Sequence, residues 1–437
     1  MKPLQVGLLG IGTVGAGTWT VLRRNEEEIA RRAGRPIRIT WVAERALDVA
    51  REKTRGADVN LTNDAHVVLA HPDIDIVVEL IGGIEPAKSF ILEAIANGKH
   101  VVTANKALVA RHGNEIFAAA HAKGVMVAFE AAVAGGIPII KALREGLTAN
   151  RIEWIAGIIN GTSNFILSEM RARGASFAEV LAEAQAHGYA EADPTYDIEG
   201  IDAAHKLTIM SAIAFGVPMQ FAKAYTEGIA QLAQEDIRYA EELGYRIKLL
   251  GITRRAPAGI ELRVHPTLIP ARRLIANVEG VMNAVLVKGD AVGPTLYYGA
   301  GAGAEPTASA VIADLVDVTR MHTADPEHRV PHLAFQPDQL TDVPVLPIGD
   351  VVTSYYLRMR VDDRPGVLAD ITRILADRDI SIEAMIQKEP PEGQDRTDII
   401  LLTHRTAERN VVDAIAKIEA LPTVRGKIVR IRMEELN

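Results

Sequence analysis

The stretch Val6-Gly7-Leu8-Leu9-Gly10-Ile11-Gly12-Thr13-Val14-Gly15 joins an apolar run, a glycine turn and the start of a segment with helical spacing. Its glycines fit G-x-G-x-x-G, and a strand before the pattern and a helix after it are the context in which this pattern binds a dinucleotide. Gly10 would permit the tight turn, Gly12 would let the backbone approach a pyrophosphate, and Gly15 would let the helix pack on the sheet. Three turn glycines without a ligand are the alternative interpretation.

Strands and helices alternate on the C-terminal side of this turn. Strands are predicted at Ile37–Ala43, Ile74–Leu80 and His100–Thr103, and helices at Thr13–Arg32 and Pro86–Asn97. Repeated βα units predict a mostly parallel sheet covered by helices. We therefore expect an α/β protein whose residues 1–130 form a Rossmann-type NAD(P)-binding domain, with residues 300–320 returning to it as a glycine-rich stretch and a helix.

Three further regions follow. Residues 131–299 mix two predicted strands, Ile152–Ile159 and Leu262–Leu268, with three predicted helices, Phe165–Arg173, Ser176–His187 and Ile201–Phe215. They are expected to form an α+β domain for substrate binding and dimerisation. Residues 321–350 lack a clear period and predict a linker. Residues 351–437 have the order βαββαβ, which predicts a ferredoxin-like unit.

The composition excludes several classes of protein. Hydrophobic residues make up 48% of the 437 residues and charged ones 24%, a balance typical of a folded globular protein. The net charge of -8 and the scattered Lys and Arg residues argue against a nucleic-acid partner. No segment approaches the roughly 20 apolar residues that cross a membrane. The chain has no Cys, and no targeting segment is visible, so we expect a cytoplasmic protein.

The end of the second predicted strand bears on the cofactor. Glu44 is placed to accept bonds from a ribose 2′-hydroxyl, which favours NAD, whereas Arg45 would pair with the 2′-phosphate of NADP. A solvated helix start is the alternative for both residues.

Acidic residues crowd a second stretch, Gly188-Tyr189-Ala190-Glu191-Ala192-Asp193-Pro194-Thr195-Tyr196-Asp197-Ile198-Glu199-Gly200-Ile201-Asp202-Ala203-Ala204-His205-Lys206. Asp202 and Lys206 are four residues apart, so they share a face of the predicted helix. A solvated salt bridge is one interpretation. The small and apolar residues around the pair favour another, a partly buried cationic donor framed by carboxylates and suited to a polar amino-acid substrate.

This second stretch closely resembles the signature of homoserine dehydrogenases. The resemblance extends to Thr103–Lys106, Glu130–Pro138, Asn160–Asn164 and Gly299–Thr307, and it covers nearly the whole chain in family order. It implies NAD(P)-dependent interconversion of L-homoserine and L-aspartate 4-semialdehyde on the route to threonine, methionine and isoleucine, with NADP favoured. No kinase-length segment is present, so a monofunctional enzyme is implied.

The family's functional residues map onto this chain. Lys206 matches the proton donor, Lys106 a second lysine between cofactor and substrate, and Asp202, together with Glu191, the carboxylates that contact the substrate. The expected substrate contacts are Glu191, Asp202, Asp197, Gly161 and Thr162. The expected cofactor contacts are Gly10, Gly12, Thr13, Val14, Gly15, Glu44, Arg45, Thr103, Lys106, Gly188 and Gly303. An ordinary strand end is the alternative for the Thr103–Lys106 turn.

Two further features are implied. Glu130 with the carbonyls of Val133, Gly135 and Ile137 matches a sodium site, although a carboxylate that caps a loop is an equal interpretation of Glu130. Residues from Ser354 onward resemble an ACT domain, with Asp362–Val367 as its first turn. L-threonine is its expected ligand, a purely structural module is the alternative, and a homodimer or homotetramer is expected.

Two rival interpretations stay open. One is a related oxidoreductase that acts on another small aldehyde or amino acid, against which the stretch from Glu191 to Lys206 argues. The other is a regulatory protein that senses an amino acid and NAD(P)H without turnover.

Overall fold

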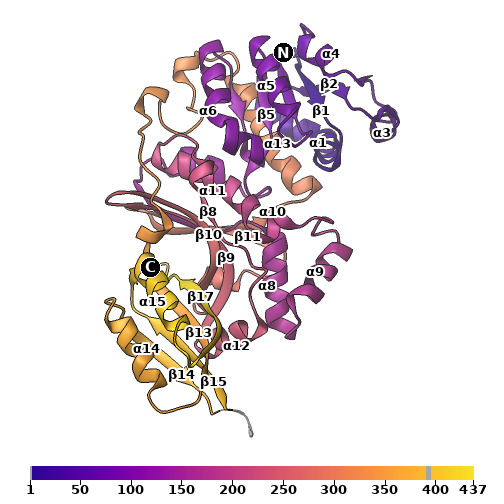
Figure 1. Ribbon diagram of the computed structural model, residues 1–437. Coiled ribbons are helices and arrows are strands. Elements are labelled where there is room, and N and C mark those ends of the chain that lie inside the picture. Colours follow the sequence, from indigo (N-terminus) through magenta and orange to yellow (C-terminus); the bar gives the residue numbers. More distant parts are fainter. Residues whose placement is uncertain (1, 390–394) are drawn as a thin grey trace. The chain divides into compact units, whose positions relative to one another are not determined.

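The computed structural model describes residues 2–389 and 395–437 and divides into two compact units. The first comprises Met1–Gly161, Ile201–Ala224 and Val281–Val343, and the second comprises Thr162–Gly200, Tyr225–Gly280 and Pro344–Asn437. Figure 1 labels the elements of both. Across these described residues, no helix combines the length and the apolar character needed to cross a membrane.

A six-stranded parallel sheet forms the N-terminal part of the first unit. Its order is β3-β2-β1-β4-β5-β6, and every strand pairs with its neighbours in parallel. The strands are β1 (Leu4–Leu9), β2 (Ile37–Ala43), β3 (Asn60–Thr62), β4 (Ile76–Glu79), β5 (His100–Thr103) and β6 (Val127–Ala128). The helices are α1 (Thr13–Arg24), α2 (Glu26–Ala33), α3 (Leu47–Lys53), α4 (Ala65–Ala70), α5 (Ala87–Ala96) and α6 (Lys106–Lys123). The predicted α/β class is confirmed.

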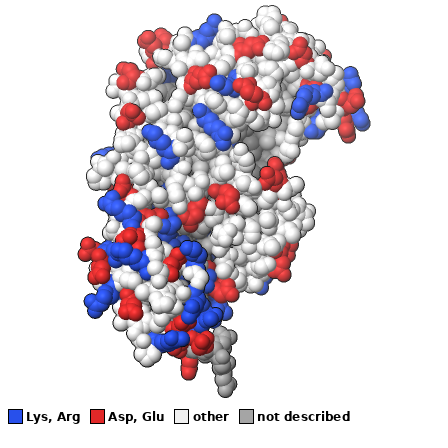
Figure 2. Space-filling view, in the orientation of Figure 1, with Lys and Arg blue, Asp and Glu red and all other residues white. Residues whose placement is uncertain are grey.

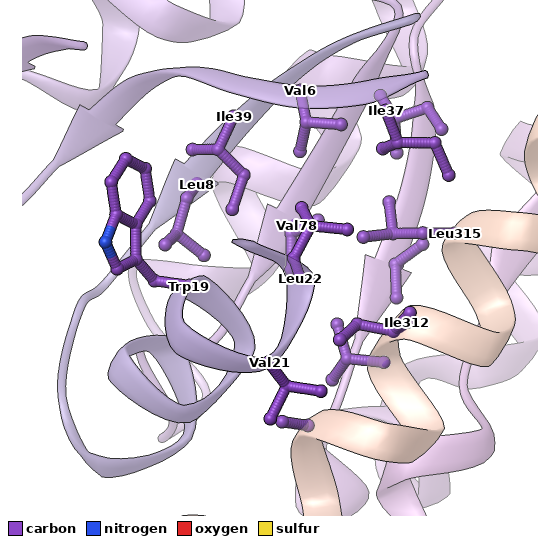
Figure 3. Close-up of a cluster of buried hydrophobic side chains, with 14 of the residues drawn as sticks. Val6, Leu8, Trp19, Val21, Leu22, Ile37, Ile39, Val78, Ile312 and Leu315 are labelled. Carbon is purple, nitrogen blue, oxygen red and sulfur yellow. The ribbon is translucent and has the colours of Figure 1, made fainter. Parts of the chain in front are cut away.

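Helix α13 (Ala304–Met321) is distant from this sheet in the sequence but packs against it. Figure 3 shows its Ile312 and Leu315 beside Val21 and Leu22 of α1, in a cluster with the strand residues of β1, β2 and β4. A Cβ on Gly17 of α1 would lie 2.4 Å from the carbonyl oxygen of Ala304, so the two helices approach closely there. Helix α13 therefore packs against α1 and the parallel sheet of this unit.

The helix predicted over Thr13–Arg32 is wrong as one element. The chain breaks at Asn25, whose φ of -111° and ψ of 21° end α1 and precede α2. Arg23 and Arg24 close the first helix, and Glu26–Glu28 open the second, which suits the partial charges at helix ends.

The rest of the first unit carries a smaller antiparallel arrangement and one buried helix. Strand β11 (Met282–Gly289) pairs with β7 (Ile152–Ile158) and with β12 (Gly293–Ala300). Helix α11 (Ile201–Phe215) matches the predicted bounds, and residues Asp202–Phe215 are buried throughout.

The second unit contains the C-terminal module and its sheet partners. The module's strands follow the order β17-β13-β15-β14, with helices α14 (Val367–Ala376) and α15 (Glu408–Glu419) packed on one face. The strands are β13 (Val352–Asp362), β14 (Ile382–Gln387), β15 (Arg396–Thr403) and β17 (Val424–Met433). The predicted βαββαβ order is confirmed, and β17 also pairs in parallel with β10 (Gly259–Pro270), next to β9 (Tyr245–Ala256).

Further elements of the second unit precede this sheet. They include α8 (Gly161–Arg173), α9 (Phe177–Ala186), α10 (Thr195–Ile198), β8 (Tyr225–Thr226) and α12 (Gln234–Glu242). The short strand β16 (Thr406–Ala407) pairs with the start of β13. On the face shown in Figure 2, acidic and basic side chains are interspersed, most densely over the C-terminal module.

Candidate active site

The glycine turn forms the expected link between β1 and α1. Gly10 has a φ of +89°, which favours glycine, and a Cβ on Gly15 would lie 2.2 Å from the carbonyl oxygen of Gly10. A Cβ on Gly12 would meet no atom within 4 Å, so the backbone there faces open space. Gly12 caps α1 without a side-chain bond, and its neighbours Thr13 and Val14 open the helix. This helix N-terminus therefore fits a pyrophosphate.

Charged side chains from the next βα unit lie beside this turn. Glu44 accepts a bond from the backbone nitrogen of Ile11 at 3.0 Å, while Arg45 is exposed. Lys53 donates to the carbonyl oxygen of Ile11 at 2.7 Å. Lys53 was missed by the sequence analysis because it lies 42 residues from Ile11 and carries no motif.

A buried carboxylate organises the end of β4 and β5. Thr103 donates to Oε2 of Glu79 at 2.7 Å, and its hydroxyl accepts from the backbone nitrogen of Asn105 at 3.0 Å. Asn105 in turn caps α6 by accepting from the nitrogen of Leu108 at 3.1 Å. These bonds fix the turn that places Lys106 at the first position of α6. These hydrogen bonds hold Thr103–Lys106 in a fixed turn between β5 and the capped start of α6.

Asp202 brings the two predicted lysines together. Its Oδ2 lies 2.7 Å from Nζ of Lys206, and its Oδ1 lies 2.9 Å from Nζ of Lys106. Lys206 also donates to the carbonyl oxygen of Ile159 at 2.7 Å, and Asn160 donates to Oδ2 of Asp202 at 2.8 Å. The side chains of Asp202 and Lys206 are 7% and 10% exposed, whereas Lys106 is 43% exposed. This is a buried carboxylate that orients two ammonium groups, not a solvated salt bridge.

Burial and charge act in opposite directions on Asp202. Burial alone would raise the pKa of its carboxyl, but Lys206 and Lys106 outweigh burial and hold that pKa well below the ordinary value. The neighbouring His205 is buried and lies 3.2 Å from Nε of Arg111, and its pKa is lowered to about 4, first by burial and then by Arg111. His205 is therefore neutral at pH 7 and adds no charge beside the lysines.

The acidic segment of the second unit is held by the start of α8. Thr162 donates to the carbonyl oxygen of Tyr189 at 2.6 Å, and Ser163 donates to that of Asp197 at 2.8 Å. Gly188 opens the segment with a φ of +73°. The Glu191 side chain is exposed. Within its unit, the structure thus brings Thr162, Gly188 and Asp197 together along one segment.

Glu130 lies in a buried acidic pair of the first unit. Its Oε1 and Oε2 accept from the backbone nitrogens of Ile140 and Lys141 at 2.9 and 2.8 Å, and its own nitrogen donates to Asp314 at 2.8 Å. Burial and then Glu130 raise the pKa of Asp314 to about 7, and burial raises that of Glu130. The loop 133–137 contains the other predicted sodium ligands, and Gly135 packs against the backbone of Gly301. Capping and cation binding both suit this arrangement.

Two further predicted site residues, Gly303 and Gly161, lie at the starts of helices α13 and α8. Gly303 precedes α13 with a φ of +128°, beside the close approach of α13 to α1. A Cβ on Gly161 would lie 2.7 Å from the carbonyl oxygen of Val281, so this position requires a glycine. The structure describes every residue that the sequence analysis assigned to the site.

Comparisons with known proteins identify the family of each region. A homoserine dehydrogenase NAD-binding domain matches residues 10–130, a homoserine dehydrogenase domain matches residues 138–316, and an ACT domain matches residues 355–423. Homoserine dehydrogenases of Pseudomonas aeruginosa and Neisseria gonorrhoeae are 64% and 60% identical to this chain, each over 100% of both chains.

A solved structure agrees with these relatives. The crystal structure of a homoserine dehydrogenase from Thiobacillus denitrificans is 74% identical, with a TM-score of 0.96 over 100% of this chain and 99% of that one. The geometry of the glycine turn and of the carboxylate between two lysines is consistent with these family matches. The chain therefore belongs to the homoserine dehydrogenase family, oxidoreductases with an NAD-binding domain, a catalytic domain and, in this chain, a C-terminal ACT domain.

Proposed function

We propose that this chain interconverts L-homoserine and L-aspartate 4-semialdehyde with Lys206 as the proton donor and acceptor. The observation that carries the proposal is the placement of Lys206 and Lys106 on the two oxygens of Asp202. A buried ammonium group that is held by a carboxylate and a carbonyl has a fixed direction, which general acid catalysis requires.

The chemistry of the reaction explains why an ammonium group is needed. NAD(P)H supplies a hydride when it is bound, and hydride addition places negative charge on the carbonyl oxygen. Lys206 donates a proton to that oxygen during reduction and takes it back during oxidation of homoserine. A positioned general acid of this kind contributes about 10²- to 10⁴-fold in rate. Lys106, at the start of α6, adds a second positive charge near Asp202.

The positively charged ammonium group of the substrate requires a carboxylate partner. On the strength of the family resemblance, we assign the binding of this group to Glu191 and Asp202. Asp197, Gly161 and Thr162 are assigned as further substrate contacts. The exposed carboxylate of Glu191 and the bond from Ser163 to the backbone of Asp197 support this assignment.

The residues around the glycine turn fit NADP as the preferred cofactor, with NAD also accepted. The exposed guanidinium of Arg45 is free to meet a 2′-phosphate, while Glu44 is engaged with the nitrogen of Ile11. For sodium, the carbonyls of Val133, Gly135 and Ile137 would join Glu130, and the raised pKa values of Glu130 and Asp314 favour a cation that would stabilise their charged forms.

We further assign the C-terminal module to regulation by L-threonine in a homodimer or homotetramer. The ACT match and the βαββαβ order support an amino-acid ligand for this module.

Absorbance at the nicotinamide band tests the central proposal. The purified full-length chain should reduce NADP and NAD in the presence of L-homoserine, with higher kcat/KM for NADP. Turnover with another small hydroxy acid and none with homoserine would support the related oxidoreductase instead. Cofactor binding without turnover on any substrate would support a sensor.

A further inference from the structure

A cavity of about 680 Å³ lies within the second unit, where the C-terminal module meets the loop after β8. Helix α15 and strand β17 line it from the module, and residues 226–228 and 230–232 line it from the other side, together with Glu199 and Pro266. We call it the seam cavity. Small-molecule sites measure roughly 300 to 1,000 Å³, so the seam cavity has room for a metabolite.

Charges of both signs line the seam cavity. Glu227 receives a bond from Tyr225 at 2.8 Å and lies 2.8 Å from Arg432 and 3.5 Å from Arg430. Within residues 2–389 and 395–437, all these partners meet Oε2 of Glu227, so Oε1 is available to another donor. The Arg430 side chain, 20% exposed, lies beside this carboxylate, and its other terminal nitrogen lies 3.0 Å from Oε1 of Glu408. The cavity therefore offers an acceptor and a cationic donor side by side.

An apolar wall completes the seam cavity. Val412 on α15 is 49% exposed, and it lines the cavity together with Ile415 and Leu232. A half-exposed valine on a helix gains from a ligand that covers it, because burial of its surface removes apolar area from water.

We propose that the seam cavity binds a free L-amino acid with a small aliphatic side chain. Its ammonium group would meet Glu227 and the exposed Glu199, its carboxylate would meet Arg430, and its side chain would cover Val412. The proposal deepens the regulatory part of the proposed function, on which its inhibitory consequence rests. It places the ligand away from the Asp362–Val367 turn, which does not line this cavity.

The seam cavity is connected to the acidic segment that precedes α11. The nitrogen of Ile229 donates to the carbonyl oxygen of Ile198 at 2.9 Å. A Cβ on Gly228 would lie 2.5 Å from Oε2 of Glu199, so the loop and the segment are in close contact. A ligand that bridges β17 and this loop would hold the end of the segment that begins at Gly188. Its occupancy would thereby bias the arrangement of the residues assigned to substrate.

Calorimetric titration of the full-length chain tests the site without relying on turnover. L-threonine and L-isoleucine are the probes, and D-threonine is the stereochemical control. The test variants are Val412→Arg, which fills the cavity, and Glu199→Gln, which removes an exposed charge. Val292→Arg is the matched control, because Val292 is 50% exposed and lies outside the cavity. Arg364→Ala reports on the turn at residues 362–367.

We expect binding heat with at least one L-amino acid, a Kd raised about tenfold or more by Val412→Arg and Glu199→Gln, and no change with Val292→Arg or Arg364→Ala. Loss of binding in Arg364→Ala with unchanged binding in both cavity variants would overturn the proposal and place the ligand at the turn. Absence of heat with both L-amino acids would also overturn it. An enzyme that binds the amino acid but fails to oxidise homoserine would contradict the proposed function and leave this site intact.

Discussion

Lys206 lies one helical turn after Asp202 on α11, and its ammonium nitrogen is 2.7 Å from Oδ2 of that carboxylate. The two side chains are 10% and 7% exposed, so neither charge can be satisfied by bulk water. Asp202 therefore both neutralises Lys206 and fixes the direction of its N–H bonds. The helical spacing of the two residues thus produces the geometry on which the proposed proton transfer rests.

Replacement of Lys206 by Ala should lower kcat by about 10² or more, because the developing alkoxide loses its proton donor. The Kd for NADPH, measured by fluorescence titration, should barely change. Lys223→Ala is the control, since Lys223 is exposed and bonds to Gln220. Near-normal turnover in Lys206→Ala would transfer the proton-donor role to Lys106 or to water.

Glu44 and Arg45 should move cofactor preference in opposite directions. Glu44→Ala removes a negative charge beside the glycine turn and should raise the ratio of kcat/KM for NADP over that for NAD. Arg45→Ala removes the expected partner of the 2′-phosphate and should lower the same ratio. Steady-state rates with both cofactors measure the two ratios. If both ratios equal that of the unmodified enzyme, neither side chain faces the ribose.

Much of the fold was predictable because its signals are local. The bounds of β2, β5 and α11 match the predicted Ile37–Ala43, His100–Thr103 and Ile201–Phe215. Each is a continuous apolar or strongly periodic segment, for which pattern and burial agree. The i, i+4 spacing likewise brought Lys206 to Asp202. The contact of Lys106 with Asp202 was not predicted, because 96 residues separate the two in the chain and no local pattern joins them.

Other features depend on contacts that no local pattern carries. Strands β9, β11 and β12 were not predicted, because their polar and glycine residues interrupt the alternation that marks a strand. Asp314 meets Glu130 across 184 residues, and Lys53 meets the glycine turn across 42. Only the folded chain brings these charges together.

The raised pKa of Asp314 predicts a pH-dependent stability. Its folded value is about 7 against an ordinary 3.8, so the folded state holds a proton that the unfolded state releases. Stability should therefore fall as pH rises from about 4 to 7, by up to roughly 4 kcal/mol for this group alone. Asp314→Asn keeps an acceptor for the nitrogen of Glu130 and removes the titration.

Calorimetry at pH 5.5 and pH 8 checks this prediction. The Tm of the unmodified chain should drop more over that interval than the Tm of Asp314→Asn. Added NaCl at pH 8 should raise the Tm of the unmodified chain more than choline chloride does if sodium binds beside Glu130. Equal Tm differences in the two proteins would mean that Asp314 is ionised throughout.

Two ion pairs join α12 to the C-terminal module, and their contributions to the free energy of unfolding should differ sharply. Asp236 is fully buried and accepts from Nε and Nη2 of Arg358 at 2.6 and 2.9 Å. Glu242 meets Lys388 at 2.5 Å, but these side chains are 41% and 51% exposed. Removal of one partner from a buried pair leaves an uncompensated charge and costs about 3 to 5 kcal/mol. Removal from an exposed pair costs about 1 kcal/mol or less.

Arg358→Ala should therefore lower the free energy of unfolding of the chain by about 3 kcal/mol, whereas Lys388→Ala should leave it nearly unchanged. Denaturant titrations of the two variants measure the difference. A double variant, Asp236→Asn with Arg358→Met, should recover part of the loss, because it removes the stranded charge and keeps the volume. Equal effects of Arg358→Ala and Lys388→Ala would show that water reaches Asp236 and that the module is held chiefly by the pairing of β10 with β17.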